Sequence, residues 1–207
     1  NISRKPAVLG KVVTTGLPSL ARQGLASIAS IMLNKTAAGF GVSAVAAMAI
    51  VLKIIMFIAS LMIGIGQGFS PVSGYNYGAK RYDRVRKAYV FLVVSGACVM
   101  SLLAALAVIF APQIIRAFRD DPEVIAIGTV TLRWQAAFLP LHALIVGTNM
   151  LMQSTRHIKQ ATFLSMNRQG VYFIPAILIL PHLFGLFGLE ITQAVADLLS
   201  TVTAIPY

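Results

Sequence analysis

The sequence is poor in charged residues, and poorest in acidic ones. Asp and Glu together number 6 among 207 residues, and all charged residues make up 11% of the chain, against about 25% in an ordinary soluble domain. Hydrophobic residues make up 57%, and the mean hydropathy is +0.81. A soluble core of this size neither needs so many apolar side chains nor lacks charge to this degree. The composition therefore favours a membrane protein over an unusually apolar soluble helical domain.

The sequence also lacks the usual marks of a disulfide, a metal site or an enzyme. Cys98 is the one cysteine, so an intrachain disulfide is excluded, and we expect this side chain to be packed among apolar neighbours. The three histidines, His142, His157 and His182, lie on different segments and do not have metal-ligand spacing. No HExxH motif and no phosphate-binding loop of Gly-Lys-Ser/Thr type occurs. We therefore expect no metal, no cofactor and no enzymatic activity.

Six apolar segments are long enough to cross a bilayer, which takes about 20 mostly apolar residues. The predicted spans are 12–34, 44–72, 88–111, 124–153, 160–181 and 187–205. The predicted connections are 34–41, 75–87, 112–123, 154–159 and 182–188. Expected kinks or ends fall at Pro71, Pro140, Pro175 and Pro181. The sequence thus predicts an all-α polytopic membrane protein, with residues 1–207 forming one six-helix bundle. Because it starts at Asn1 and stops within an apolar run, we expect a segment of a longer protein.

The basic residues alternate between the two sides of this predicted topology. Eleven fall on one side: Arg4, Lys5, Lys11, Lys80, Arg81, Arg84, Arg86, Lys87, Arg156, Lys159 and Arg168. Three fall on the other, Lys35, Arg116 and Arg119, and three lie within spans, Arg22, Lys53 and Arg133. The positive-inside rule makes the first side cytoplasmic, so both ends of the segment are expected there. Because the basic residues separate apolar spans, the net charge of +11 does not indicate a nucleic-acid partner.

Polar side chains recur at helical spacing inside four of the predicted spans. Small and polar residues at such spacing suit helix packing, but ionisable groups at membrane depth are costly unless they face water or a partner. We therefore favour a shared water-filled cavity for substrate or ion. Its candidate residues are Gln23, Ser27, Lys53, Ser60, Gln67, Gln135, His142, Asn149, Glu190, Gln193 and Asp197.

Asp197 is the sharpest single candidate, because it lies about ten residues into the last span. One interpretation is a carboxyl group that exchanges protons with a cavity. The other is a structural group, either in an ion pair with Lys53 or Arg133 or bonded to a broken helix. Glu190 is nearer the interface and fits a solvated helix start, and His142 fits a packed, hydrogen-bonded histidine better than a proton relay.

Several segments together resemble the carboxyl-terminal half of a multidrug and toxic compound extrusion (MATE) transporter, helices seven to twelve. The most specific is GIGQGFSPVSGYNYGAKRYDRVRK at 64–87. Supporting segments are GLPSL at 16–20, GFGVSAVAA at 39–47, MLMQSTRHIKQATFLSMNRQ at 150–169 and GLFGLEITQAVADLLS at 185–200. The resemblance covers essentially the whole chain. It implies one lobe of a twelve-helix transporter, whose partner is an amino-terminal six-helix half of the same protein.

The resemblance further implies export of cationic or amphipathic drugs across the bacterial cytoplasmic membrane, coupled to sodium or protons. One branch of the family has carboxylates in the first and fourth helices of this half. Here Gln23, Ser27 and His142 stand near those places, so that cation site is not reproduced. Apolar drug contacts are expected from residues such as Met56, Phe57, Phe138 and Tyr172. The alternatives are a flippase for a lipid-linked sugar or polysaccharide, held by inward-facing Arg22, Lys53 and Arg133, and a non-transporting membrane scaffold.

Overall fold

The computed structural model describes residues 6–204, and at 6–19, 21, 22, 158 and 169 it describes the backbone alone. All regular secondary structure in this range is helical, which confirms the all-α fold class. The helices are α1 Pro6–Ala38, α2 Val42–Gly78, α3 Tyr82–Ile109, α4 Ala111–Phe118, α5 Pro122–Ala137, α6 Leu139–Ser154, α7 Ile158–Met166, the π-helix η1 Asn167–Tyr172, α8 Phe173–Phe184 and α9 Leu186–Ala204. Helices suit a bilayer because they satisfy their own backbone hydrogen bonds.

Three continuous helical stretches are long and apolar enough to cross a membrane within the described range. They are α2, α3 and the run Lys159–Phe184, and the bent pair α5–α6 passes the same criterion as a fourth. The bend between α5 and α6 is 50° and lies next to Pro140, one of the expected kink points. Pro71, by contrast, lies inside the unbroken α2. Membrane crossing by α1 and α9, at the predicted ranges 12–34 and 187–205, stays a prediction.

The connections are shorter and more helical than the sequence predicted. The expected loop 75–87 is mostly the end of α2 and the start of α3, and only 79–81 separates them. The expected loop 112–123 contains α4, which begins with Pro112 in its first turn. Charged residues mark where a helix leaves the bilayer, but they do not stop helix formation. Hydropathy therefore located the spans better than it located the helix ends.

Two turns at one end of the bundle close with the same backbone motif. After α2, the amide of Lys80 donates to Tyr77 O and that of Arg81 to Asn76 O. After α6, the amide of Arg156 donates to Gln153 O and that of His157 to Met152 O. These are Schellman motifs, in which one residue adopts the left-handed conformation. Here that residue is Lys80 (φ 57°) in one turn and Arg156 (φ 65°) in the other.

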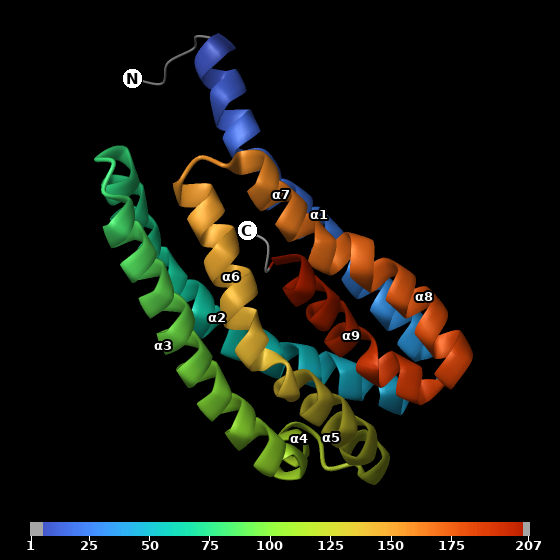
Figure 1. Ribbon diagram of the computed structural model, residues 1–207. Coiled ribbons are helices and arrows are strands. Elements are labelled where there is room, and N and C mark those ends of the chain that lie inside the picture. The colour runs from blue at the N-terminus through green and yellow to red at the C-terminus, as the bar shows by residue number, and fades with distance from the viewer. Residues whose placement is uncertain (1–5, 205–207) are drawn as a thin grey trace.

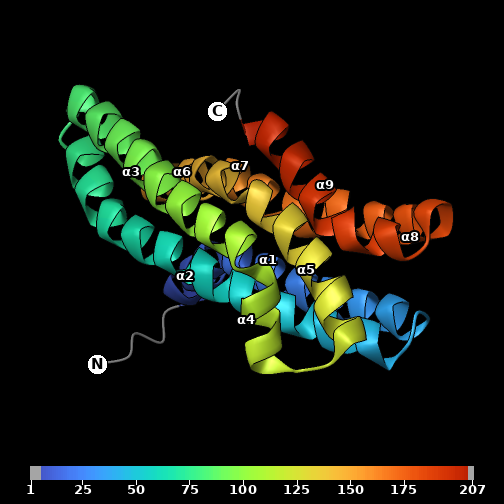
Figure 2. The same cartoon turned by 90° about the horizontal axis from the view of Figure 1, so that it is seen from below.

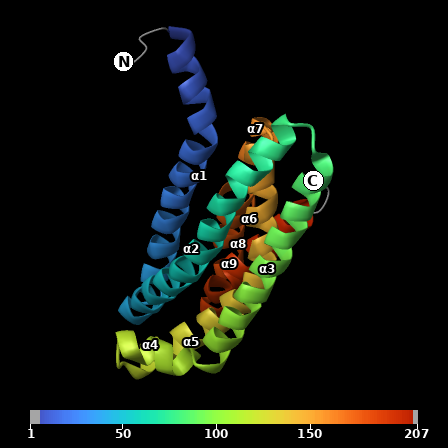
Figure 3. The same cartoon turned by 90° about the vertical axis from the view of Figure 1, so that its left-hand side faces the viewer.

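The helices form one bundle in which α6 and α9 lie between two outer groups (Figures 1 and 2). α2 and α3 pack on one side, with α1, α7 and α8 on the other, and α1 and α2 diverge from their connecting turn (Figure 3). Large buried side chains such as Met62, Leu92 and Leu132 alternate with many buried alanines, which permit close helix contact. Large apolar side chains are also exposed along the outer helices, as at Phe91 and Leu102, which fits contact with lipid.

The two ends of the bundle differ in charge. The turns 79–81 and 155–157 lie at the same end of the bundle. Tyr77, just before the first turn, packs edge-on against His157 of the second, with 6.3 Å between the ring centroids. We call this the basic end. Its charged residues in the described range are Lys80, Arg81, Arg84, Arg86, Lys87, Arg156 and Lys159, with Asp83. At the opposite end, Lys35, Arg116 and Arg119 are balanced by Asp120, Asp121 and Glu123. The basic residues of the turns 79–81 and 155–157 and of the adjoining helix ends therefore agree with the predicted alternation.

Candidate functional site

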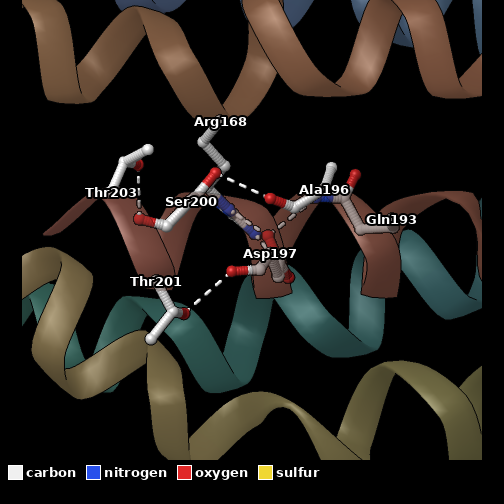
Figure 4. Close-up of polar contacts among 7 residues, drawn as sticks. All are labelled: Arg168, Gln193, Ala196, Asp197, Ser200, Thr201 and Thr203. Atoms are coloured by element: carbon white, nitrogen blue, oxygen red, sulfur yellow. Dashed lines mark hydrogen bonds and ion pairs between the residues drawn. The ribbon is translucent and has the colours of Figure 1, made fainter. Parts of the chain in front are cut away.

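A buried ion pair joins η1 to the middle of α9. The Arg168 Nε donates to Asp197 Oδ1 at 2.5 Å, and a terminal guanidinium nitrogen lies 3.4 Å from Oδ2. The two side chains are only 20% and 10% exposed. Figure 4 shows Arg168 reaching across to Asp197 from the neighbouring helical segment. One guanidinium group therefore contacts both carboxylate oxygens, closely at Oδ1 and more loosely at Oδ2, and such charge-assisted hydrogen bonds are stronger than neutral ones.

Neighbouring polar groups hold the pair in place. The Gln193 side chain donates to Asp197 Oδ1 at 3.1 Å, and the Thr201 hydroxyl donates to the Asp197 backbone carbonyl at 2.8 Å (Figure 4). These contacts confirm that Gln193, Asp197 and Thr201 share one face of α9. His142 on α6 is buried and lies close enough for both charges of the pair to act on it electrostatically. The site is thus a polar centre shared by η1, α9 and α6.

The segment that carries Arg168 departs from α-helical geometry. η1 is a π-helical turn between α7 and α8. Such turns are rare in proteins, and those that occur often lie at functional sites. Asn167 is 1% exposed, and both of its side-chain amide atoms lack a hydrogen-bond partner in the described structure. A buried unpaired polar group costs about 1–3 kcal/mol. The π turn therefore carries two costly groups, the charged Arg168 and the unpaired Asn167.

Comparison with known proteins identifies the family. The sequence model of the MatE family matches residues 18–178. The chain belongs to the MatE family. The multidrug export protein MepA of Staphylococcus haemolyticus is 22% identical over 92% of this chain and 42% of its own length. That of Staphylococcus saprophyticus is 24% identical over 95% of this chain and 43% of its own. The predicted resemblance is confirmed, and the chain spans less than half the length of these curated relatives.

Solved structures show the same fold. An outward-facing multidrug resistance MATE family transporter of the MOP superfamily superposes with a TM-score of 0.89 and 22% identity, over 100% of this chain and 47% of its own. The Vibrio cholerae MATE transporter VcmN in its bent form gives a TM-score of 0.88 and 22% identity, over 100% and 46%. The MatE chain is therefore an integral membrane protein with the fold of about half of such a transporter.

The predicted cavity residues of the MatE chain fall into two groups. Gln135, His142, Glu190 and Asp197 are buried, and Asn149 and Gln193 are partly buried, all on α5, α6 and α9. The remaining predicted residues are exposed on α1 and α2: Gln23, Ser27, Lys53, Ser60 and Gln67. The structure therefore brings the first group into the bundle interior and leaves the second on its surface. A cavity shared by all four helices stays a prediction.

Asn149 has a structural role in this arrangement. Its amide nitrogen donates to the Ala161 carbonyl at 2.8 Å and to the Ser165 hydroxyl at 2.9 Å. The Gln153 amide in turn donates to Asn149 Oδ1 at 2.5 Å. These bonds tie α6 to α7 and leave Asn149 little capacity for a ligand. Gln135 differs, because its side-chain oxygen is buried and without a hydrogen-bond partner in the described structure.

The ion-pair partner of Asp197 was predicted wrongly. The sequence offered Lys53 or Arg133, whereas the partner is Arg168, which was assigned to the cytoplasmic connection. Arg168 lies eight residues beyond the start of the predicted span 160–181, in the polar run NRQG. A charge that deep in an apolar segment needs a buried partner. The depth of Arg168 within the predicted span was therefore a signal for a buried partner. Grouping Arg168 with the nearby Arg156 and Lys159 led to its assignment to the cytoplasmic side.

Other basic residues and the cysteine also differ from expectation. Lys53 and Arg133 are exposed, and the Arg133 Nε donates to the Val108 carbonyl at 3.3 Å. The side chain of Arg22 lies outside the described residues. Lys53 and Arg133 therefore do not form a buried cation cluster inside the described lobe. Cys98, expected to be packed, is exposed on α3.

Proposed function

We propose that this chain is one lobe of an antiporter that exports cationic or amphipathic drugs in exchange for sodium or protons. The observation that carries the proposal is its membership of the MatE family, together with multidrug export proteins as relatives over 92–95% of its length. Because the chain spans about two fifths of those relatives, the partner is a second lobe of similar size. We place the protein in the bacterial cytoplasmic membrane with the basic end in the cytoplasm.

In this proposal the exposed polar residues of α1 and α2 face the partner lobe. Gln23, Ser60 and Gln67 are exposed on the described lobe although they lie inside apolar helices. Polar groups facing lipid are unfavourable, so a wet boundary between lobes is the setting that suits them. Met56 and Phe57, also exposed on α2, would supply apolar contacts to a drug. Rocking of the two lobes would open this boundary to each side of the membrane in turn.

A dye-efflux assay with the full-length protein tests the proposal. We expect cells that lack their own efflux pumps to accumulate less of a fluorescent cationic dye when they express it. Removing external sodium and, separately, collapsing the proton gradient would identify the coupling ion, because export should fail in one case. Unchanged dye accumulation relative to cells with an empty vector would contradict drug export.

Thiol labelling tests the position of the lobe boundary. In a full-length Cys98→Ser background, we expect Gln23→Cys and Ser60→Cys to react with a membrane-impermeant thiol reagent. Leu102→Cys is the control, because Leu102 is also exposed on the lobe but lies on α3, which we expect lipid to cover. Equal protection of all three positions would place Gln23 and Ser60 in lipid or in a dry interface.

A further inference from the structure

A groove opens at the basic end of the bundle, where four helices meet. A pocket of about 540 Å³ lies between the ends of α2 and α6 and the beginnings of α3 and α7. A second pocket of about 700 Å³ continues along α3, and the two share Arg86 and Val90 in their walls. The ends of the elements that line this basic-end groove lie toward the top of Figures 1 and 3. The groove is therefore continuous from the turns of the basic end to the apolar surface of α3.

One end of the groove suits an anion. Arg86 lines both pockets and Lys87 lines one, against a single acidic wall residue, Asp83. α3 and α7 both begin at the groove, since Tyr82 and Gln160, in their first turns, line it. Helix amino termini carry partial positive charge and favour anions such as phosphate.

The His157 ring at the same end is fixed in place. The hydroxyl of Thr155 lies 2.9 Å from its Nδ1, and Tyr77 packs against the ring edge-on. His157 therefore offers a positioned polar group in the groove wall, opposite α3. With Arg86, the anion site spans the beginning of α3 and the turn 155–157.

The other end of the groove suits a hydrocarbon chain. Val90, Phe91 and Val94 follow Arg86 along α3, line the second pocket and are at least half exposed, with Phe91 at 73%. They lead away from the basic end toward the apolar middle of α3. Tyrosines at the rim, such as Tyr82, are typical of the level of lipid headgroups. A ligand that fits both ends carries a phosphate and an acyl chain.

We propose that the basic-end groove binds one anionic phospholipid. Its phosphate lies between Arg86, His157 and the amino termini of α3 and α7, and an acyl chain lies along Val90, Phe91 and Val94. Such a lipid bridges the beginning of α3 to the turn 155–157. This binding is independent of drug exchange and requires only that the basic end face the headgroup level of a membrane.

Lipid titration of the full-length protein in a neutral detergent, followed by native mass spectrometry, tests the site. We expect one phosphatidylglycerol to bind saturably, and phosphatidylcholine to bind at least several-fold more weakly. Arg86→Gln should weaken phosphatidylglycerol binding about fivefold, the effect of one basic residue near an anionic lipid. Arg84→Gln is the matched control, because it removes the same charge two residues away and Arg84 lines neither pocket. Arg86→Lys should keep the affinity within about twofold, since the positive charge near the anionic lipid is retained.

Three results would overturn the proposal. Equal loss of affinity in the Arg84 and Arg86 variants would show only general attraction to the basic end. Equal binding of the two lipids would remove the role of the headgroup charge. Displacement of phosphatidylglycerol by an equal concentration of inorganic phosphate would show a phosphate site without a lipid chain.

Discussion

Replacing Asp197 by asparagine in the full-length protein should be far more damaging than replacing both members of its ion pair. The single change leaves the Arg168 guanidinium, 20% exposed, without its counter-charge. Removing one partner of a buried pair costs about 3–5 kcal/mol because it leaves an uncompensated buried charge, whereas removing both charges leaves none. We therefore expect the double variant Arg168→Gln/Asp197→Asn to recover most of the lost stability.

The two single variants should also differ from each other. A guanidinium group cannot lose its proton in a protein, whereas a carboxyl group can accept one and become neutral. Arg168→Gln therefore leaves a group that can discharge itself, and Asp197→Asn leaves one that cannot. The order of stability should be wild type and double variant highest, then Arg168→Gln, then Asp197→Asn.

Thermal unfolding of the detergent-solubilised full-length protein measures these differences. If this lobe of 207 residues unfolds as one cooperative unit, a loss of about 3 kcal/mol in its free energy of unfolding lowers its Tm by roughly 6–12 °C. Strictly additive effects of the two substitutions would refute the reasoning, because groups in direct contact must show a coupling energy. Dye efflux by the double variant separates structure from transport: export that recovers together with stability assigns the pair a structural role.

Two further predictions concern backbone geometry. Gly188→Ala should destabilise by about 1–3 kcal/mol, because its methyl group would overlap the Leu180 carbonyl in the tight α8–α9 turn. Gly68→Ala is its control in the same thermal assay and should be neutral or slightly stabilising, since nothing lies near its added methyl. Lys80→Gly should raise stability by about 0.5–1 kcal/mol, because φ is 57° there, and a decrease in Tm would show that its side chain contributes more than its backbone costs.

Hydropathy predicted the fold class because a helix that crosses a bilayer must be apolar along most of its length. Each predicted span matches a helical stretch of the structure, even where α5 and α6 bend at the expected proline. The connections were harder to predict. Short Schellman turns at Lys80 and Arg156 depend on backbone conformations that the side chains themselves disfavour. The π turn at 167–172 packs against α9 and α1, contacts that a single sequence does not display.

The candidate site was predicted only in part, for a similar reason. Periodicity correctly placed Gln193, Asp197 and Thr201 on one face of α9. It could not decide which helix that face meets, because helical spacing describes one helix at a time. The same limit applies to the cavity shared by the polar residues of α2 and α9, which stays a prediction: Lys53 and Ser60 are exposed on the described lobe, and Asp197 is buried.

The ion pair limits where a coupling cation can bind in the proposed antiporter. Exchange requires a group whose affinity for the cation differs between two states. Asp197 gives both carboxylate oxygens to Arg168, so it holds no free charge while the pair is closed. Four of the other acids, Asp83, Asp120, Asp121 and Glu123, lie at the ends of the bundle. Glu190 is the remaining acid inside a helix of the bundle. In the proposed mechanism, cation binding therefore falls to Glu190 or to carboxylates of the partner lobe, unless the Arg168–Asp197 pair opens during transport.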